Sequence, residues 1–402
     1  PDELERAFKE GVSFDASAVT GFMKVEESDL LLFPEANTMY LLPWRPQHGR
    51  VVRFFCNIKH PDGRDFEGDC RNILKEVIKD SKQKGFTCKI GCESEFYLFE
   101  QDEFGNPTMI PYDKGTYCDI YPNDRCENIR RDICLSLEEM GIKPTSSHHE
   151  QGPGQNEIDY EYSNALSAAD NLISFRSLVK TKASENGLFA SFMPRPLETE
   201  CGSGLHINIS LYKDNKNIFE DKNDKQYKYA ESFISGILNR IEEITLFLNS
   251  STNSYKRLGK DKAPKYITWS KENRSQLIRI PASKGDRCRM ELRSPDSSCN
   301  PYIAFALLIK AGIEGIEKNL QLCNPHNINL FNANDNKVKN LKTLPNNLNE
   351  AINNALNSEF IKTVLPQKTI NNYIDDKKQE WDIYNSITDK FKAEKELYFE
   401  KF

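Results

Sequence analysis

Residues 90–99 read I-G-C-E-S-E-F-Y-L-F and place two carboxylates, Glu93 and Glu95, inside an apolar and aromatic run. Alternate residues of a β-strand point to opposite faces, so both glutamates share one face. Two like charges this close repel each other, and a cation between them relieves the repulsion. Two exposed glutamates on an amphipathic strand are the alternative. The stretch predicts a central strand whose polar face belongs to a binding site.

Two further stretches repeat this pattern. Residues 205–210, L-H-I-N-I-S, follow the turn Gly202-Ser203-Gly204, and residues 289–293 read R-M-E-L-R. A lone histidine such as His206 is more often a core residue than a ligand, but Asn208 and Ser210 repeat on its face. Charged groups among apolar neighbours cost several kcal/mol unless they are paired or bound to metal. We therefore expect the polar strand faces to line one cavity.

Acidic and basic groups recur in two other segments. Residues 148–157, H-H-E-Q-G-P-G-Q-N-E, carry two carboxylates around a Gly- and Pro-containing turn, which taken alone could be a solvated loop. Residues 273–281, N-R-S-Q-L-I-R-I-P, add arginines suited to bidentate binding of phosphate or carboxylate. Glutamates with one imidazole favour Mg²⁺ or Mn²⁺ over a thiolate zinc site. Metal ligands with clustered arginines indicate phosphoryl transfer, without the P-loop motif.

The composition limits the class of protein. The chain has 402 residues, 38% hydrophobic and 28% charged, with a formal net charge of -6. These values are typical of a globular protein of two or three domains and give no electrostatic reason to expect nucleic acid or a membrane as partner. The eleven cysteines include no C-x-x-C pair and are expected to be reduced. No apolar run is long enough for a membrane span and no signal peptide is evident, which predicts a cytoplasmic protein.

The order of predicted elements indicates an α+β fold. Short extended pieces occupy the first sixty residues, and a turn at 60–63 precedes a helix over 68–84. Polar-alternating strands then interleave with helices, and polar loops are expected at 214–226 and 332–342. The tail from Pro345 is expected to be helical. The further helices are predicted at 124–140, 165–185, 227–248 and 301–322.

Six motifs together resemble the glutamine synthetase family, in the family's order and approximate spacing, over nearly the whole chain. They are C-E-S-E-F-Y-L-F (92–99), H-H-E-Q-G-P-G-Q-N-E (148–157), G-S-G-L-H-I-N-I-S-L (202–211), N-S-Y-K-R-L (253–258), N-R-S-Q-L-I-R-I-P (273–281) and R-M-E-L-R-S-P-D (289–296). The resemblance implies a truncated N-terminal β-grasp domain at 1–62 that carries the ammonium-site loop. It also implies a catalytic domain at 63–402, with a curved antiparallel sheet backed by helices.

The resemblance further implies an ATP-dependent ligase that joins ammonia to the γ-carboxylate of glutamate through γ-glutamyl phosphate. Its substrates would be glutamate, ammonium and ATP, and its role the biosynthesis of glutamine in nitrogen metabolism. Two or more Mg²⁺ or Mn²⁺ ions would bind each site, and the chain would form a homo-oligomer, a dodecamer with active sites between subunits. The implied metal ligands are Glu95, Glu150 and Glu157 for one ion, and Glu93, His206 and Glu291 for the other.

The remaining roles implied by the resemblance concern the substrates. Asp15 would bind and deprotonate ammonium, and Arg274 would act on the transferred phosphoryl group. ATP would be bound by Tyr162, Asn208, Ser210, Arg279 and Arg289. Glutamate would be bound by Gly202, Arg257 and Arg293.

The sequence departs from the family around the amine and the amino acid. Cys201 stands in place of an asparagine, and Ala18 in place of a serine in the ammonium loop. The loop between Leu258 and Ala263 is about one residue short and lacks the glutamate directly before Ala-Pro. A cationic Lys262 near the ammonium site would be unfavourable if it pointed inward, and Asp261 is the candidate for the missing role. The adenylylation context reads N-L-K-T-L-P at 340–345, without its tyrosine.

These departures leave alternatives open. One is a γ-glutamyl amide ligase that uses a primary amine or polyamine. Another is a catalytically silent relative, disfavoured because all six metal ligands are present. A guanidino kinase is a more distant alternative, since such enzymes hold ATP with arginines and do not need paired glutamates.

Overall fold

The computed structural model describes residues 2–45, 48–221 and 223–402. Its N-terminal unit holds a three-stranded antiparallel sheet in the order β1-β2-β5, beside a two-stranded ribbon, β3-β4. Ala16, Leu30 and Phe66 form its small core. The extended pieces agree with the sequence analysis, whereas α1 was not predicted. The elements are α1 (Asp2–Glu10), β1 (Val12–Asp15), β2 (Asp29–Pro34), β3 (Tyr40–Leu41), β4 (Val52–Arg53) and β5 (Cys56–Lys59).

The rest of the chain is built on an eleven-stranded sheet centred on one long strand, β6 (Phe86–Gln101). The order is β14-β15-β16-β12-β6-β9-β8, and every pairing is antiparallel except that of β14 with β15. Shorter strands pair with β6 and β12 at their ends. The other strands are β7 (Pro107–Pro111), β8 (Pro144–His149), β9 (Gln155–Tyr160), β10 (Ser163–Asn164), β11 (Leu188–Ser191), β12 (Leu205–Lys213), β13 (Lys216–Asn217), β14 (Trp269–Lys271), β15 (Ile278–Ile280) and β16 (Met290–Leu292).

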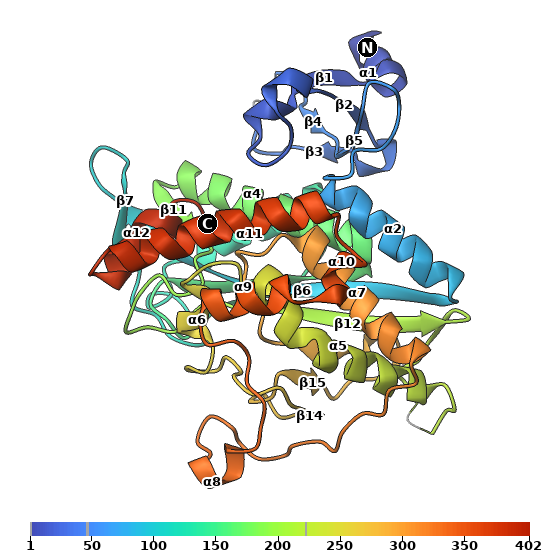
Figure 1. Ribbon diagram of the computed structural model, residues 1–402. Coiled ribbons are helices and arrows are strands. Elements are labelled where there is room, and N and C mark those ends of the chain that lie inside the picture. The colour runs from blue at the N-terminus through green and yellow to red at the C-terminus, as the bar shows by residue number, and fades with distance from the viewer. Residues whose placement is uncertain (1, 46–47, 222) are drawn as a thin grey trace.

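Helices surround this sheet, and the N-terminal unit projects from one side of the molecule (Figure 1). The predicted helices at 165–185 and 227–248 match α4 and α5 at both ends. The loop predicted at 332–342 contains the short helix α8. The helices are α2 (Cys70–Gln83), α3 (Glu127–Glu139), α4 (Ala165–Glu185), α5 (Tyr227–Leu248), α6 (Ser254–Arg257), α7 (Pro301–Glu317), α8 (Asp335–Val338), α9 (Leu348–Leu356), α10 (Glu359–Lys362), α11 (Gln367–Ser386) and α12 (Lys390–Tyr398).

Local chemistry sets the ends of helix α7. Asn300 caps its first turn by accepting from the amides of Tyr302 and Ile303, and Pro301 starts the helix. The predicted end at 322 was wrong, because Asn319 takes a left-handed conformation with φ of 50°. The amide of Leu320 then donates to the carbonyl of Gly315, which closes the helix early.

The sheet's apolar face and the helices behind it make the main core. Helices α5 and α7 pack backbone against backbone, since a Cβ atom on Gly236 would lie 2.2 Å from the carbonyl oxygen of Ala311. This close packing backs the sheet with a rigid layer and leaves the polar strand face for a site. All eleven cysteines are unpaired, as expected. Among the described residues, no helix is long and apolar enough to cross a membrane.

Candidate active site

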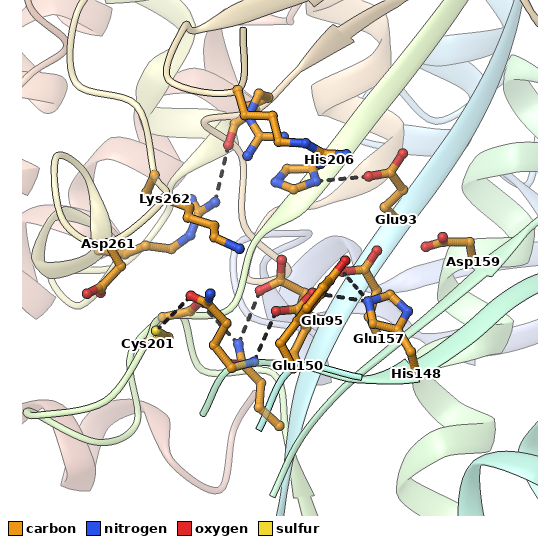
Figure 2. A pocket seen from close by; sticks show the side chains of 18 of the residues that line it. Glu93, Glu95, His148, Glu150, Glu157, Asp159, Cys201, His206, Asp261 and Lys262 are labelled. Atoms are coloured by element: carbon orange, nitrogen blue, oxygen red, sulfur yellow. Dashed lines mark hydrogen bonds and ion pairs between the residues drawn. The ribbon is translucent and has the colours of Figure 1, made fainter. Parts of the chain in front are cut away.

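A strongly charged cavity of about 290 Å³ lies over the polar face of the sheet. Its acidic side comes from β6, β9 and the turn before β9, with His148 of β8 beside them, and its basic side from the segments around β15 and β16. Figure 2 shows the acidic side chains of these strands facing one another across the cavity. Segments almost 200 residues apart in sequence are thus joined in one chamber.

Strand register brings the predicted ligands together. Across β12, β6 and β9, Glu93 lies opposite His206 on one side and opposite Asp159 on the other. Two residues along β6, Glu95 lies opposite Glu157. Because the side-chain period of a strand is two, both rows point to the same face.

The first cluster consists of Glu93, His206 and Glu291, whose ligand atoms lie within 4.8 Å of one another. His206 Nδ1 is 3.0 Å from Glu93 Oε2 and 3.7 Å from Glu291 Oε1. Burial raises the pKa of Glu93, but hydrogen bonds from His206 and Asn208 outweigh it and lower the pKa to about 2. This group is therefore the trio expected to share one ion.

The second cluster consists of His148, Glu150 and Glu157, again within 4.8 Å. His148 Nε2 is 3.1 Å from Glu150 Oε1 and 4.0 Å from Glu157 Oε2. Glu95, the third ligand expected here, lines the same cavity. One of its oxygens accepts from the amide of Gly204 at 2.9 Å and from Gln155 Nε2 at 3.2 Å. His148 of β8, which lies opposite Glu157 of β9, was not predicted as a ligand from the sequence.

The acidic side carries more negative charge than its protein partners offset. Burial, and then the charges of Asp159, Glu95, Glu93 and Glu150, raise the pKa of Glu157 well above its usual value. Burial and the neighbouring Glu93 raise the pKa of Asp159 to about 7. A buried oxygen of Asp159 has no hydrogen-bond partner among the described residues. Clustered hard ligands with excess negative charge fit divalent cations.

Arginines form the basic side. Glu291, fully buried, pairs with Arg279 and, at 2.6 Å, with Arg293 Nη1. Arg289 Nε donates to Asn208 Oδ1 at 2.7 Å, and the side-chain nitrogen Nδ2 of Asn208 donates to Glu93 Oε1 at 2.9 Å. Arg274, Arg279, Arg289 and Arg293 all line the cavity, as expected.

Glycines allow one more arginine to reach the cavity wall. Arg257, only 4% exposed, donates to the carbonyls of Ser294 and Arg293 at 2.8 and 3.2 Å. A Cβ atom on Gly204 would lie 2.4 Å from Arg257 Nη2, and one on Gly202 would lie 2.7 Å from the carbonyl oxygen of Pro194. The Gly-Ser-Gly turn is thus needed for the close approach of these groups.

Five predicted residues lie outside the cavity lining: Glu291 and Asn208, which bond to lining residues, and Tyr162, Ser210 and Asp15. Tyr162 packs against the backbone of Gly91, with Lys89 Nζ 5.4 Å from its ring centre. Ser210 donates its hydroxyl to the carbonyl of Cys288 at 3.0 Å. Asp15 lies in the N-terminal unit, where it is exposed and caps a short 3-10 helix, with Oδ1 accepting from the amide and hydroxyl of Ser17.

Comparison with known proteins agrees with this geometry. The family model described as "Glutamine synthetase, catalytic domain" matches residues 67–396, and "Glutamine synthetase, beta-Grasp domain" matches residues 1–61. The chain belongs to the glutamine synthetase family. The expected fold, an N-terminal β-grasp domain and a catalytic domain of sheet and helices, is confirmed, as is the expected enzyme class, a glutamate–ammonia ligase.

Individual relatives cover most of the chain. Glutamine synthetases of Methanosarcina mazei and Clostridium saccharobutylicum are 44% and 45% identical to it, over 96% of this chain and 88% of theirs. The Plasmodium falciparum glutamine synthetase structure has a TM-score of 0.84 at 27% identity, covering 95% of this chain and 88% of that one. A structure described as a GmaS/ADP complex has a TM-score of 0.87 at 28% identity, covering 98% and 92%.

One group that sequence reasoning missed lies directly behind the glutamine synthetase site. His149 is fully buried, with Nε2 2.9 Å from Asp113 Oδ1 and Nδ1 2.6 Å from the carbonyl oxygen of Glu150. Both partners are acceptors, so both ring nitrogens carry protons. Burial lowers the pKa of His149, but the hydrogen bond to Asp113 outweighs it and raises the pKa. This pair fixes the backbone that carries Glu150. Its signal in the sequence is only a second histidine beside the first.

Two of the family departures, Cys201 and the loop that holds Asp261 and Lys262, lie at the mouth of the cavity. Cys201 Sγ lies 3.4 Å from Gln151 Oε1, and burial raises the pKa of the thiol to about 11. Asp261 pairs with the buried Arg195 at 2.8 Å. Lys262 points into the cavity, with Nζ 5.0 Å from the ring centre of Tyr117 (Figure 2). This inward direction is the one expected from the sequence to be unfavourable for ammonium.

Proposed function

We propose that this cavity carries out the family's reaction, the ATP-dependent ligation of ammonia to the γ-carboxylate of glutamate. Glu93, His206 and Glu291 would hold one Mg²⁺ or Mn²⁺ ion, and Glu95, Glu150 and Glu157 a second, with His148 beside the latter. When bound, the ions supply Lewis-acid stabilisation of negative charge on the phosphoryl group and the carboxylate. The observation that carries this proposal is the opposition of an acidic wall and an arginine wall across one cavity.

The chain's own residues would bind and orient both substrates. Arg274, Arg279 and Arg289 would hold the ATP phosphates and stabilise charge on the transferred phosphoryl group. Arg257, Arg293 and the Gly202 backbone would hold glutamate. Tyr162, Asn208 and Ser210 would lie on the nucleotide side, because Asn208 joins Glu93 to Arg289 and Ser210 follows it along β12.

Ammonium binding would need a second subunit. Asp15 is exposed in the N-terminal unit and does not line the cavity of its own chain. It would act as the base for ammonium by reaching a neighbouring subunit, in a ring-shaped homo-oligomer with twelve subunits as in the family. We place the boundary between the β-grasp and catalytic domains at residues 62 and 63. The cytoplasm would be the site of action.

The activity is tested by measuring phosphate release with glutamate and Mg-ATP and a panel of acceptors: ammonium, methylamine, ethanolamine and putrescine. We expect the highest kcat/KM with ammonium. A protein for which ammonium were no better than the amines would be a γ-glutamyl amide ligase. That second candidate is favoured by Cys201 and by the shortened loop between Leu258 and Ala263, which differ from the family while the metal ligands and arginines are in place.

Metal binding should release protons. Burial and like charges raise the pKa of Glu157, so this carboxyl binds a proton more strongly in the metal-free protein than an ordinary glutamate does. Metal ligands must be deprotonated, so Mn²⁺ affinity should rise with pH. Calorimetry in two buffers of different ionisation enthalpy counts the protons. Fewer protons should be released when Mn²⁺ binds to the Glu157→Gln variant. A Mn²⁺ affinity that does not change with pH would contradict the proposed role of Glu157.

A further inference from the structure

Lys262 lies at the mouth of the cavity, on the side where the acidic residues lie. Lys262 follows Asp261, whose φ is 52°, in a turn in which the amide of Ala263 donates to the carbonyl of Lys260 at 2.9 Å. The 2.8 Å ion pair from Asp261 to buried Arg195 attaches this turn to the protein. The backbone that carries Lys262 is therefore held in place.

The side chain of Lys262 is directed inward. Its ammonium lies 5.0 Å from the ring centre of Tyr117, in the geometry of a cation–π contact. Its charge helps to lower the pKa of Glu150, after the larger effect of the hydrogen bond from His148. Figure 2 shows it running toward Glu95 and Glu150. Among the described carboxylates, none lies within 4.0 Å of Lys262 Nζ, so its charge acts on the cavity.

We propose that Lys262 determines the acceptor specificity of the site by repelling cationic amines at the mouth. This inference rests on the proposed ligase function. In neutral water an acceptor amine is present mainly as an ammonium or alkylammonium ion. The carboxylates of the cavity attract every such cation alike. The lysine charge opposes that attraction, and its aliphatic stem with Tyr117 narrows the mouth. Ammonium, the smallest of these cations, is excluded least, and alkylammonium ions and diamines are excluded more.

The test compares Lys262→Met, which keeps length and removes charge, with Lys262→Arg, which keeps the charge. We expect Lys262→Met to lower the KM for ammonium about tenfold, the usual size of a single-charge effect across a partly solvated cavity. The kcat/KM for methylamine should rise by more than that for ammonium, while the KM for ATP stays unchanged; equal rises would mean that Lys262 does not set acceptor specificity. Lys262→Arg should resemble the parent protein.

An unchanged or higher KM for ammonium in Lys262→Met would overturn the proposal. So would a loss of kcat alone, which would mean that Lys262 contacts the phosphoryl group. A failure of the proposed ligase function can be told apart from a failure of the Lys262 proposal, since the parent protein would then release no phosphate with any acceptor. In that case the midpoint of thermal unfolding is compared in ammonium chloride and in choline chloride. A larger stabilisation by ammonium in Lys262→Met than in the parent supports the proposal, and an equal one refutes it.

Discussion

Replacing Glu291 with glutamine should lower kcat by more than about 100-fold, since loss of even an outer partner of a metal ligand costs about 10- to 100-fold. Glu291 is fully buried and pairs with residues of both walls of the cavity. It contacts Arg279 and Arg293 and lies 3.7 Å from His206. Its neutral replacement would remove a proposed metal ligand and leave two guanidinium groups near the cavity without their counter-charge.

The same change should destabilise the metal-free protein by about 3 kcal/mol, because removing one partner of a buried ion pair leaves the other charge uncompensated. Urea unfolding in the presence of a chelator measures this. Glu314→Gln is the matched control, since Glu314 also pairs with an arginine, Arg240, but on helices α5 and α7 away from the cavity. It should cost about 1 kcal/mol and leave activity intact. Equal effects of the two variants would contradict a special role for Glu291.

The sequence predicted the central strands because their alternation is local. Glu93 and Glu95 stand two residues apart on β6, and their common face follows from the period of a strand. The order of neighbouring strands does not follow from any local pattern. Only the register of β9 against β6 places Asp159 beside Glu93, and only β8 places His148 beside Glu157. Both residues were therefore missed, although they touch the predicted ligands.

Interactions remote in sequence account for the other omissions. The buried His149–Asp113 pair joins positions 36 residues apart, and neither residue lies in an alternating polar pattern with the other. The early end of α7 is a local exception, since it depends on the left-handed conformation of Asn319, two residues past the helix. The direction of Lys262 depends on the ion pair between Asp261 and Arg195, which lie 66 residues apart. Composition and periodicity carry no information on such contacts.

Two inactive variants should restore activity to each other when they form mixed oligomers. Asp15→Asn keeps the oxygen that accepts from Ser17, so the local turn is preserved, but the amide cannot take a proton from ammonium. Glu157→Gln removes a proposed metal ligand on the cavity wall of its own chain. If each site takes Asp15 from a neighbour, random mixing gives about one quarter of sites with both native residues, because two chains contribute independently to a heterologous interface.

Mixed oligomers are prepared by co-expression of differently tagged chains and sequential affinity capture, and phosphate release is measured with glutamate, ammonium and Mg-ATP. We expect about one quarter of the parent activity per site, far above either variant alone. The control mixes chains that carry Glu157→Gln with chains that carry Glu95→Gln. Each change alters the acidic wall of the chain that carries it, so no mixed site has both native residues and the two variants should not complement each other. Because Asp15 lies outside the cavity of its own chain, a site completed within one subunit would require the N-terminal unit to move. Mixed oligomers no more active than the mean of the two single variants would mean that Asp15 does not act across a subunit boundary.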